Sequence, residues 1–209
     1  MIDPIRFVYF DLGNVLATFS VDRACRNVSD RWAVSPEDVR RVVWDSGLQD
    51  RFEHGEVSAD RFAAEVRRSL GLDASSAPTD ELLDRLSDMF DPIVEMVDLV
   101  DAVRATGIDM GILSNTCEAH WRWLIRSGYA ALRGPWNRVI LSYEHGAMKP
   151  AESIYRIAGE AAGHPVGSIL FFDDRADNVL AAKAGGWQAH RFTDAGSARE
   201  VLTLGGVLD

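Results

Sequence analysis

Cysteine, positive charge and long apolar runs are all scarce in this sequence, and each shortage argues against a class of protein. Cys25 and Cys117 are its only cysteines, and neither belongs to a CxxC motif or to a cluster of cysteine and histidine. A disulfide framework and a structural zinc site are therefore not expected. We interpret both thiols as inert side chains in a reducing compartment.

Acidic side chains outnumber basic ones, since 32 Asp and Glu face 22 Lys and Arg and give a net charge of −10. That charge disfavours nucleic acid and anionic lipid as partners. No apolar run approaches the ~20 residues that span a bilayer, and the segment from Met1 to Arg6 lacks the basic and apolar regions of a signal peptide. The sequence thus predicts a soluble, cytoplasmic protein that binds neither nucleic acid nor membrane.

Buried strands alternate with helices over most of the chain. Residues 5–10 form an apolar run without alternation, typical of a strand covered on both faces. Further apolar runs lie near residues 108–113, 138–142, 168–172 and 188–192. Helical patterns flank them near residues 93–106, 117–127, 151–162, 177–184 and 195–203. This order predicts the α/β class, with a Rossmann-like parallel sheet and helices on both of its faces.

A helical insertion interrupts the alternation after the first strand. Residues 21–90 carry almost no strand signal. Helices are expected there over residues 36–43 after an N-cap at Ser35, over 58–70 before Gly71, and over 79–90 with a cap formed by Thr79, Asp80 and Glu81. We expect this insertion to be all-helical.

The insertion divides the chain into two domains. A length of 209 residues is enough for one substantial core and a small added domain. We assign residues 1–16 and 92–209 to the core, and residues 17–91 to the helical domain.

The reactive side chains gather near the ends of the predicted strands. They are Asp11, Ser114, Asn115, Lys149, Asp173 and Asp174. Ligands of open α/β sheets bind beyond the carboxyl ends of the strands, so one pocket would receive a nucleophile, a hydroxyl, an ammonium group and a carboxylate pair. Each residue by itself has an ordinary interpretation as a turn, a helix cap or a surface charge. Together and in this order they outline a phosphoryl-transfer site.

These residues also carry a family resemblance. The four motifs of the haloacid dehalogenase-like hydrolase superfamily are similar, in order and spacing, to Asp11-Leu12-Gly13-Asn14-Val15, Ser114-Asn115, Lys149-Pro150 and Asp173-Asp174 with Asn178. The resemblance spans nearly the whole chain and implies a Mg²⁺-dependent phosphatase, as most members are, with the helical insertion as its cap domain. The first and last motifs resemble those of small bacterial sugar-phosphate phosphatases, including enzymes that act on glucose 1-phosphate.

The chemistry of the individual side chains points the same way. Asp11 leaves a buried strand into a turn, where its carboxylate can attack phosphorus and carry an aspartyl-phosphate intermediate. Lys149 would neutralise Asp11 and the phosphoryl group, which makes it both catalytic and substrate-binding. Ser114 and Asn115 would bind phosphoryl oxygens through a hydroxyl and backbone N–H groups, or would merely cap the helix expected from about residue 117.

The paired Asp173 and Asp174 indicate a metal site beside Asp11. Two carboxylates ~4 Å apart repel by about 4 kcal/mol at an effective dielectric constant of 20, so a proton or a cation has to lie among them. Oxygen-only ligands suit Mg²⁺. We expect Asp11, Asp174 and the Gly13 carbonyl as direct ligands, Asp173 as a partner through water, and Asn178 to orient the loop. The alternative is an exposed acidic turn that caps the next helix.

Gly13 departs from the pattern that the resemblance implies. Most phosphatases of this superfamily carry a second Asp two positions after the nucleophile as general acid and base, a role typically worth ~10²–10⁴-fold in rate. The candidates to replace it are Asp45, Glu53 and His54, in the polar stretch of residues 44–56. The alternative for that stretch is a solvated turn between helices.

Three functions are compatible with the sequence. The first is Mg²⁺-dependent hydrolysis of a small phosphorylated metabolite, expected to be a sugar phosphate, through an aspartyl-phosphate. The second is a haloacid dehalogenase in which the same Asp11 attacks carbon without a metal, although Asp173 and Asp174 would repel an anionic haloacid. The third is a non-catalytic module that binds phosphate or protein. The physiological substrate is left open, as is the choice between monomer and homodimer.

Overall fold

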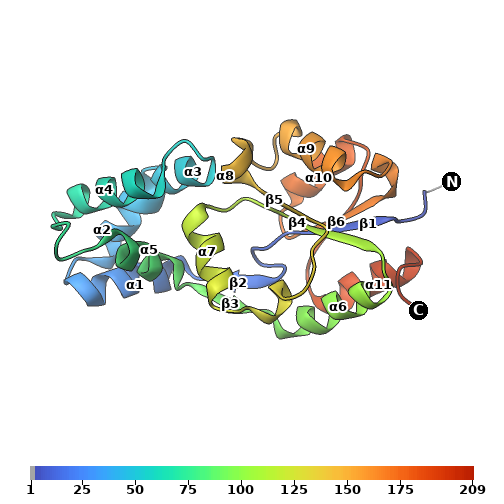
Figure 1. The fold of residues 1–209 in the computed structure, drawn as a ribbon, viewed down its shortest axis with the longest axis horizontal. Coiled ribbons are helices and arrows are strands. Elements are labelled where there is room, and N and C mark those ends of the chain that lie inside the picture. Colours follow the sequence, from blue (N-terminus) through green and yellow to red (C-terminus); the bar gives the residue numbers. More distant parts are fainter. Residues whose placement is uncertain (1–2) are drawn as a thin grey trace.

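A parallel sheet forms the centre of the chain, which a computed structural model describes over residues 3–209. Over these residues its strand order is β5-β4-β1-β6-β7, and each neighbouring pair is parallel (Figure 1). The strands are β1 (Phe7–Phe10), β4 (Asp109–Ser114), β5 (Arg138–Leu141), β6 (Ile169–Asp173) and β7 (Gln188–Arg191). The α/β sheet predicted from the apolar runs is confirmed.

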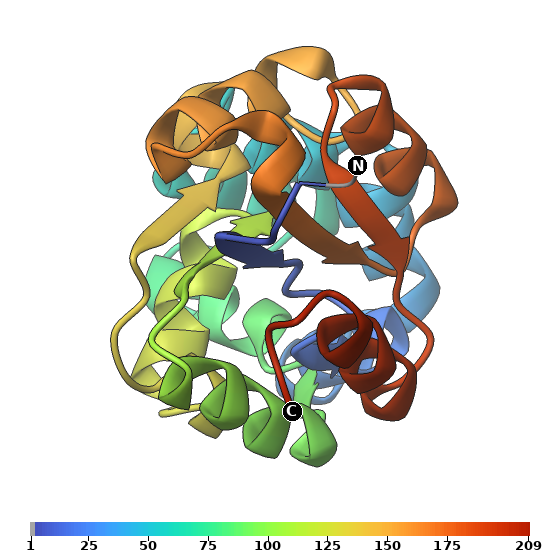
Figure 2. The same ribbon diagram turned by 90° about the vertical axis from the view of Figure 1, so that its right-hand side faces the viewer.

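Helices cover both faces of the sheet (Figure 2). On one face lie α6 (Val94–Ala105) and α11 (Ala195–Leu204), and on the other lie α9 (Glu152–Ala162) and α10 (Ala176–Ala184). The central strand alternates between these layers, because Val8 and Phe10 pack with the first pair of helices and Phe7 and Tyr9 with the second. Both faces are apolar environments, which is why β1 shows no polar alternation.

The segment between β1 and α6 folds mainly into a helical body at one end of the molecule, on the left in Figure 1. Its helices are α1 (Val21–Trp32), α2 (Pro36–Arg40), the π-helical turn η1 (Arg41–Asp45), α3 (Leu48–Glu53), α4 (Ala59–Leu70) and α5 (Thr79–Ser87). Phe52 and Phe62 are part of a core that these helices bury. The Ser35 side chain caps α2 and Gly71 ends α4 with φ +68°, as predicted. The Ser58 side chain caps α4, one residue before the helix begins.

The end of this segment corrects two predictions. The helix expected over residues 79–90 stops at Ser87, because Phe90–Pro92 forms β3 and pairs antiparallel with β2 (Ala17–Phe19). Thr79 does not cap α5, since Pro78 holds the N-cap position. The chain therefore enters and leaves the helical body through a two-stranded ribbon that the sequence did not reveal.

The polar stretch of residues 44–56 is also more ordered than a solvated turn. It contains α3, which begins after Gly47, a residue with φ +78°. Leu48 and Phe52 are buried on one side of this helix. Their spacing of four residues places both on one helix face, and this pattern was too short to predict a helix.

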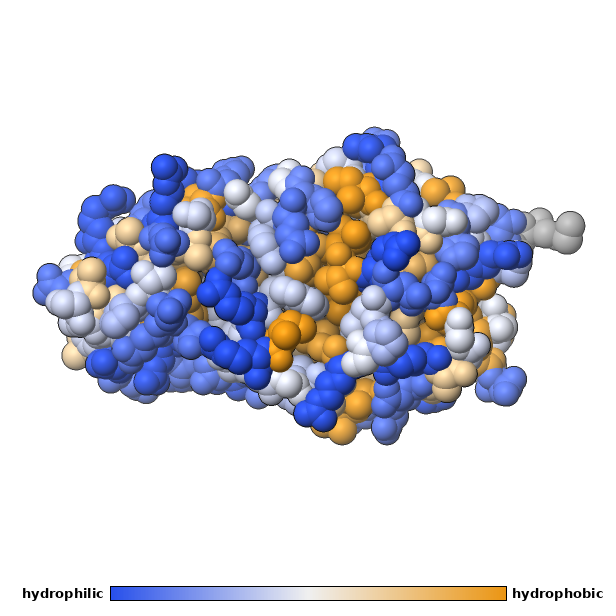
Figure 3. Space-filling model, viewed as in Figure 1, coloured by the Kyte–Doolittle hydropathy of each residue, from blue (hydrophilic) through white to orange (hydrophobic). Residues whose placement is uncertain are grey.

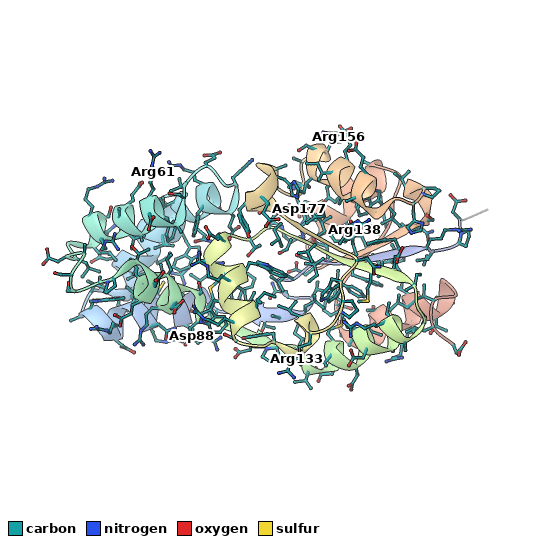
Figure 4. All side chains as sticks on the ribbon, in the orientation of Figure 1. Arg61, Asp88, Arg133, Arg138, Arg156 and Asp177 are labelled. Carbon is teal, nitrogen blue, oxygen red and sulfur yellow. The ribbon has the colours of Figure 1, made fainter. Side chains whose placement is uncertain are left out.

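The surface carries most of the charge. Figure 3 shows a largely hydrophilic face over the helical body and more apolar area over the part that contains the sheet. Charged side chains such as Arg61 and Arg156 point outward from their helices (Figure 4). Among the helices of residues 3–209, none has the length and apolar content that crossing a bilayer requires.

Candidate active site

The carboxyl ends of β1, β4 and β6 border one cavity of about 510 Å³ between the sheet and the helical body. These strands are adjacent and parallel, so the residues that follow them meet at one edge. The predicted site residues in its lining are Asp11, Gly13, Ser114, Asn115, Lys149 and Asp174. Asp173 lies behind them and is completely buried. The fold thus brings all the predicted site residues together.

Lys149 reaches this edge from the loop after α8 (Ser142–His145). Its buried ammonium group lies 2.8 Å from Asp11 Oδ1 and 2.6 Å from Asp173 Oδ2, and it donates to the Leu113 carbonyl at 3.0 Å. These acceptors match the three N–H donors of a lysine. A phosphoryl oxygen can therefore bind Lys149 only by replacing one of them.

Asp11 is a buried carboxyl group whose charge depends on its neighbours. Its Oδ1 accepts a hydrogen bond from the Leu12 N–H at 2.6 Å, in addition to the contact with Lys149. Burial raises the pKa of Asp11 to about 7, while Lys149 acts in the opposite direction and Asp173 raises the pKa further. Added positive charge in the cavity would favour the ionised form.

Asp173 contacts protein groups rather than the cavity. Both of its oxygens lie 3.0 Å from the Asn178 side-chain nitrogen, and Oδ1 also accepts from the Arg175 N–H at 2.9 Å. Lys149 occupies Oδ2. Asn178 therefore orients Asp173, and Asp173 in turn holds the ammonium group.

Asp174 faces the cavity and is positioned by Asn14, whose Nδ2 donates to its Oδ2 at 3.0 Å. Asn14 has a left-handed backbone conformation, with φ +55°, which asparagine adopts more readily than most residues. Sequence reasoning placed Asn14 in the first motif but gave its side chain no role, and so missed this contact. An asparagine directly after glycine in the first motif was the available signal.

The carboxylates of Asp11, Asp173 and Asp174 form one acidic cluster, with an oxygen of each within 4.8 Å of the others. When all are ionised, the Lys149 ammonium compensates one of three negative charges. Within residues 3–209 the buried Asn178 Oδ1 also has no hydrogen-bond partner. Excess negative charge, oxygen-only donors and an unpartnered oxygen together fit a hydrated, hard divalent cation.

The loop after β4 carries three polar side chains with different contacts. Asn115 is bonded to Lys149, because its Nδ2 donates to the Lys149 carbonyl and its Oδ1 accepts from the Lys149 N–H, both at 2.8 Å. Ser114 is buried and donates to the Asn115 carbonyl at 3.3 Å. Neither caps α7 (Glu118–Arg126), whose N-cap residue is Cys117. Thr116, which sequence reasoning missed, also lines the cavity. Its buried hydroxyl has no hydrogen-bond partner within residues 3–209.

The helical body supplies the opposite wall of the cavity, with Trp44, Gln49, Asp50 and Glu53. Glu53 Oε1 accepts a hydrogen bond from Gln49 Nε2 at 2.8 Å. Burial raises the pKa of Glu53 to about 7, and the bond from Gln49 acts in the opposite direction. This wall therefore holds a carboxyl group that can be protonated near neutral pH.

The other residues considered as proton donors lie elsewhere. Asp45 is exposed and lies outside the lining, and His54 Nε2 lies 3.0 Å from the Gly146 carbonyl oxygen. His120 of α7, which was not predicted, does line the cavity. Burial lowers its pKa to about 4, so its imidazole is neutral at physiological pH.

A model of haloacid dehalogenase-like hydrolases matches residues 5–186. The chain belongs to the haloacid dehalogenase-like hydrolase family. This hydrolase is 31% identical over 217 residues to Phosphatase MT3486 from Mycobacterium tuberculosis, with 98% of this chain and 97% of the relative covered. It is 26% identical to (S)-2-haloacid dehalogenase from Pseudomonas putida, with 85% of this chain and 80% of the relative covered. The superfamily membership expected from the four motifs is confirmed.

The haloacid dehalogenase-like fold is shared with solved structures. One is a HAD family enzyme from Bacteroides thetaiotaomicron in complex with magnesium and inorganic phosphate. It superposes on this hydrolase with a TM-score of 0.75 and 22% identity, and the match covers 91% of this chain and 95% of that one. The shared fold therefore extends over most of both chains.

Proposed function

We propose that this hydrolase is a Mg²⁺-dependent phosphatase that acts on a sugar or polyol phosphate through an aspartyl-phosphate intermediate. The acidic cluster of Asp11, Asp173 and Asp174 beside one ammonium group carries the proposal. Such a cluster repels an anionic substrate until a cation is bound, and the cation then attracts a phosphate dianion. The magnesium and phosphate complex of the structural relative and the name of the mycobacterial relative support this proposal.

Asp11, Asp174 and the Gly13 carbonyl are the proposed ligands of Mg²⁺, which would supply positive charge beside the phosphoryl oxygens. Asp11 is the proposed nucleophile. Lys149 and the Leu12 N–H restrain its carboxyl group through Oδ1. Attack forms a bond between Asp11 and phosphorus while the bond to the leaving oxygen breaks, and water then cleaves the intermediate.

The phosphoryl oxygens are proposed to bind along the loop after β4. Ser114 offers its hydroxyl when a phosphoryl oxygen replaces its long contact with the Asn115 carbonyl. Asn115 offers its backbone N–H, because its side chain is bonded to Lys149. The unpartnered Thr116 hydroxyl is a further donor in the same lining. Lys149 balances charge on Asp11 and contributes directly when a phosphoryl oxygen replaces one of its acceptors.

The opposite wall favours a neutral, hydroxylated leaving group. Trp44 and Phe19 present aromatic side chains to the cavity, and Gln49, Asp50 and Glu53 present hydrogen-bonding groups. Within residues 3–209, the helical body contributes no lysine or arginine to the cavity lining, and Arg175 of the core, which does line the cavity, is paired with Asp177. We therefore propose a monophosphorylated substrate whose remaining groups are hydroxyls.

The proposal also assigns a role to each of the two domains. Residues 1–16 and 92–209 form the catalytic core, and residues 17–91 form the cap that selects the substrate. The cap residues in the cavity lining support this division of roles.

Phosphate release tests the proposal. Protein stripped of metal by a chelator is assayed with sugar phosphates, polyol phosphates, nucleotides and phosphorylated acids, with and without Mg²⁺, and halide release from 2-chloropropionate is measured in parallel. We expect Mg²⁺-dependent phosphate release, fastest for monophosphorylated sugars or polyols and absent in Asp11→Asn. Halide release without metal would instead identify a dehalogenase. If neither phosphate nor halide is released, the result would favour a non-catalytic binding module.

A further inference from the structure

Departure of an alkoxide from phosphorus needs a proton, and in-line displacement restricts where the donor lies. The leaving oxygen is opposite the attacking oxygen of Asp11. The donor must therefore reach the leaving oxygen either from the loop of Asp11, where most of the superfamily carries its acid at the position of Gly13, or from the cavity wall across from Asp11. The helical body forms that wall. Within residues 3–209 it contributes two carboxyl groups to the cavity lining, those of Asp50 and Glu53.

The loop that carries Asp11 has no acid at position 13, and the Phe19 ring crowds that position. A Cβ atom on Gly13 would lie 3.3 Å from the ring of Phe19, tighter than an ordinary van der Waals contact. The ring thus occupies the space beside Gly13. The loop therefore presents a glycine and a neighbouring aromatic ring instead of an acid, so the proton has to come from another group that lines the cavity.

Other titratable groups in the lining are committed or unsuited. Lys149 donates to three protein acceptors, Arg175 is paired with Asp177, and Asp174 belongs to the cluster that fits a cation. The His120 imidazole is neutral because burial lowers its pKa to about 4, and a neutral imidazole is a poor acid. Asp50 is exposed on α3.

Glu53 is held in place through both its backbone and its side chain. Its carbonyl accepts a hydrogen bond from Ser142 Oγ at 2.6 Å, and that hydroxyl also accepts from the Thr116 N–H at 2.9 Å. Oε1 accepts from Gln49 Nε2, and Gln49 is itself buried against Cys117. Within residues 3–209 no donor contacts Oε2, so this oxygen is available to a ligand.

We infer that Glu53 is a catalytic residue that protonates the leaving oxygen, an inference that rests on the proposed phosphatase function. In the first step the bond between Asp11 and phosphorus forms, the bond to the leaving oxygen breaks, and its electron pair takes the proton of Glu53. In the second step water bonds to phosphorus, the bond to Asp11 breaks, and a proton of the water returns to Glu53. One ester and one water give one alcohol and one phosphate.

The surroundings of Glu53 suit this exchange. Burial raises its pKa to about 7, Gln49 opposes the shift, and the negative charges of Asp50 and Asp11 add to it. The Cys117 thiol stays neutral because burial raises its pKa to about 12. Within residues 3–209, the flanking helices α4 and α8 contribute no titratable group to the cavity lining. Near neutral pH both protonation states of Glu53 are populated, as a general acid that is later a base requires.

The test compares Glu53→Gln with wild type on p-nitrophenyl, phenyl and benzyl phosphate, whose leaving oxygens become steadily more basic. We expect kcat/KM of the variant to fall about 10²–10⁴-fold with benzyl phosphate and less than about fivefold with p-nitrophenyl phosphate. With benzyl phosphate, the wild-type decline above about pH 7 should be absent in Glu53→Gln. The exposed Glu56→Gln is the matched control and should leave all three rates unchanged.

Equal losses on all three esters, or a steep dependence of the wild-type rate on leaving-group basicity, would overturn the role of Glu53. If wild type releases no phosphate from any ester, the proposed function itself has failed. Should Glu53→Gln prove unstable, Glu53→Asp decides the question because it retains the acid. The shorter side chain moves this acid away from the leaving oxygen, so a larger loss of kcat/KM relative to wild type with benzyl than with p-nitrophenyl phosphate supports the proton donor, and equal losses overturn it.

Discussion

The Ser142 hydroxyl lies 2.6 Å from the Glu53 carbonyl oxygen and joins the end of α3 to the loop after β4. Ser142 is completely buried, accepts a hydrogen bond from the Thr116 N–H at 2.9 Å and lies 3.0 Å from the Thr116 carbonyl oxygen. A hydroxyl has one proton to donate, so the shorter contact with Glu53 is its stronger bond. The cavity wall with Glu53 and the proposed phosphate-binding loop therefore share one anchor.

Replacing Ser142 by Ala should weaken that anchor. The variant leaves the Thr116 N–H and the Glu53 carbonyl without a buried partner, and we expect a loss of about 1–3 kcal/mol in the free energy of unfolding. KM should rise as well, because α3 is held less firmly against the loop. Urea denaturation and steady-state kinetics measure both effects. Ser75→Ala, an exposed serine of the helical body, is the control. Wild-type stability and KM in Ser142→Ala would contradict the anchoring role.

Lys149→Met should destabilise the fold strongly. The substitution leaves the buried carboxylates of Asp11 and Asp173 without their cation, which typically costs 3–5 kcal/mol, about the cost of breaking a buried ion pair. Adding Asp173→Asn should recover part of the loss, because one uncompensated charge is removed. Chemical denaturation compares the single and double variants with Lys183→Met, which replaces an exposed lysine. A loss below about 1 kcal/mol in Lys149→Met would show that the ion pairs contribute little.

Asn14→Gly should weaken Mg²⁺ binding without straining the backbone. Glycine accepts the φ of +55° found at this position, so the variant removes only the hydrogen bond that positions Asp174. Loss of a partner that orients a metal ligand typically costs about 10–100-fold in affinity. Isothermal titration with Mg²⁺ measures it directly, and Asp174→Ala serves as the comparison with a larger expected loss. Equal Mg²⁺ affinity in wild type and Asn14→Gly would show that Asn14 does not contribute to Mg²⁺ binding.

His120 should make the protein less stable in acid. Burial lowers its folded-state pKa from 6.5 to about 4, so between these values the unfolded chain binds more protons and stability falls as pH falls. Between about pH 7.5 and 4.5, wild type should lose about 2–3 kcal/mol relative to His120→Gln. Urea unfolding at both pH values tests this, with the exposed His145→Gln as control. Parallel pH dependences of wild type and His120→Gln would be incompatible with a buried neutral imidazole.

The sequence by itself determined the sheet and the place of the site. The apolar run that ends at Phe10 and the one that ends at Phe172 predict buried strands from local composition, and the polar residues after them then fall at one sheet edge. Ser35 and Gly71 predicted the start of α2 and the end of α4 for the same reason, since capping depends on residues within one turn of the helix end.

The tertiary structure decided which groups meet across that edge. Asn14 and Asp174 are 160 residues apart, and Ser142 and Glu53 are 89 apart, yet each pair forms a hydrogen bond. The strands β2 and β3 likewise need each other to form. No local pattern encodes such contacts, because they exist only after the strands have aligned and the helical body has folded back over them. That step turned Glu53 from one polar residue in an ambiguous stretch into the carboxyl group across the cavity from Asp11.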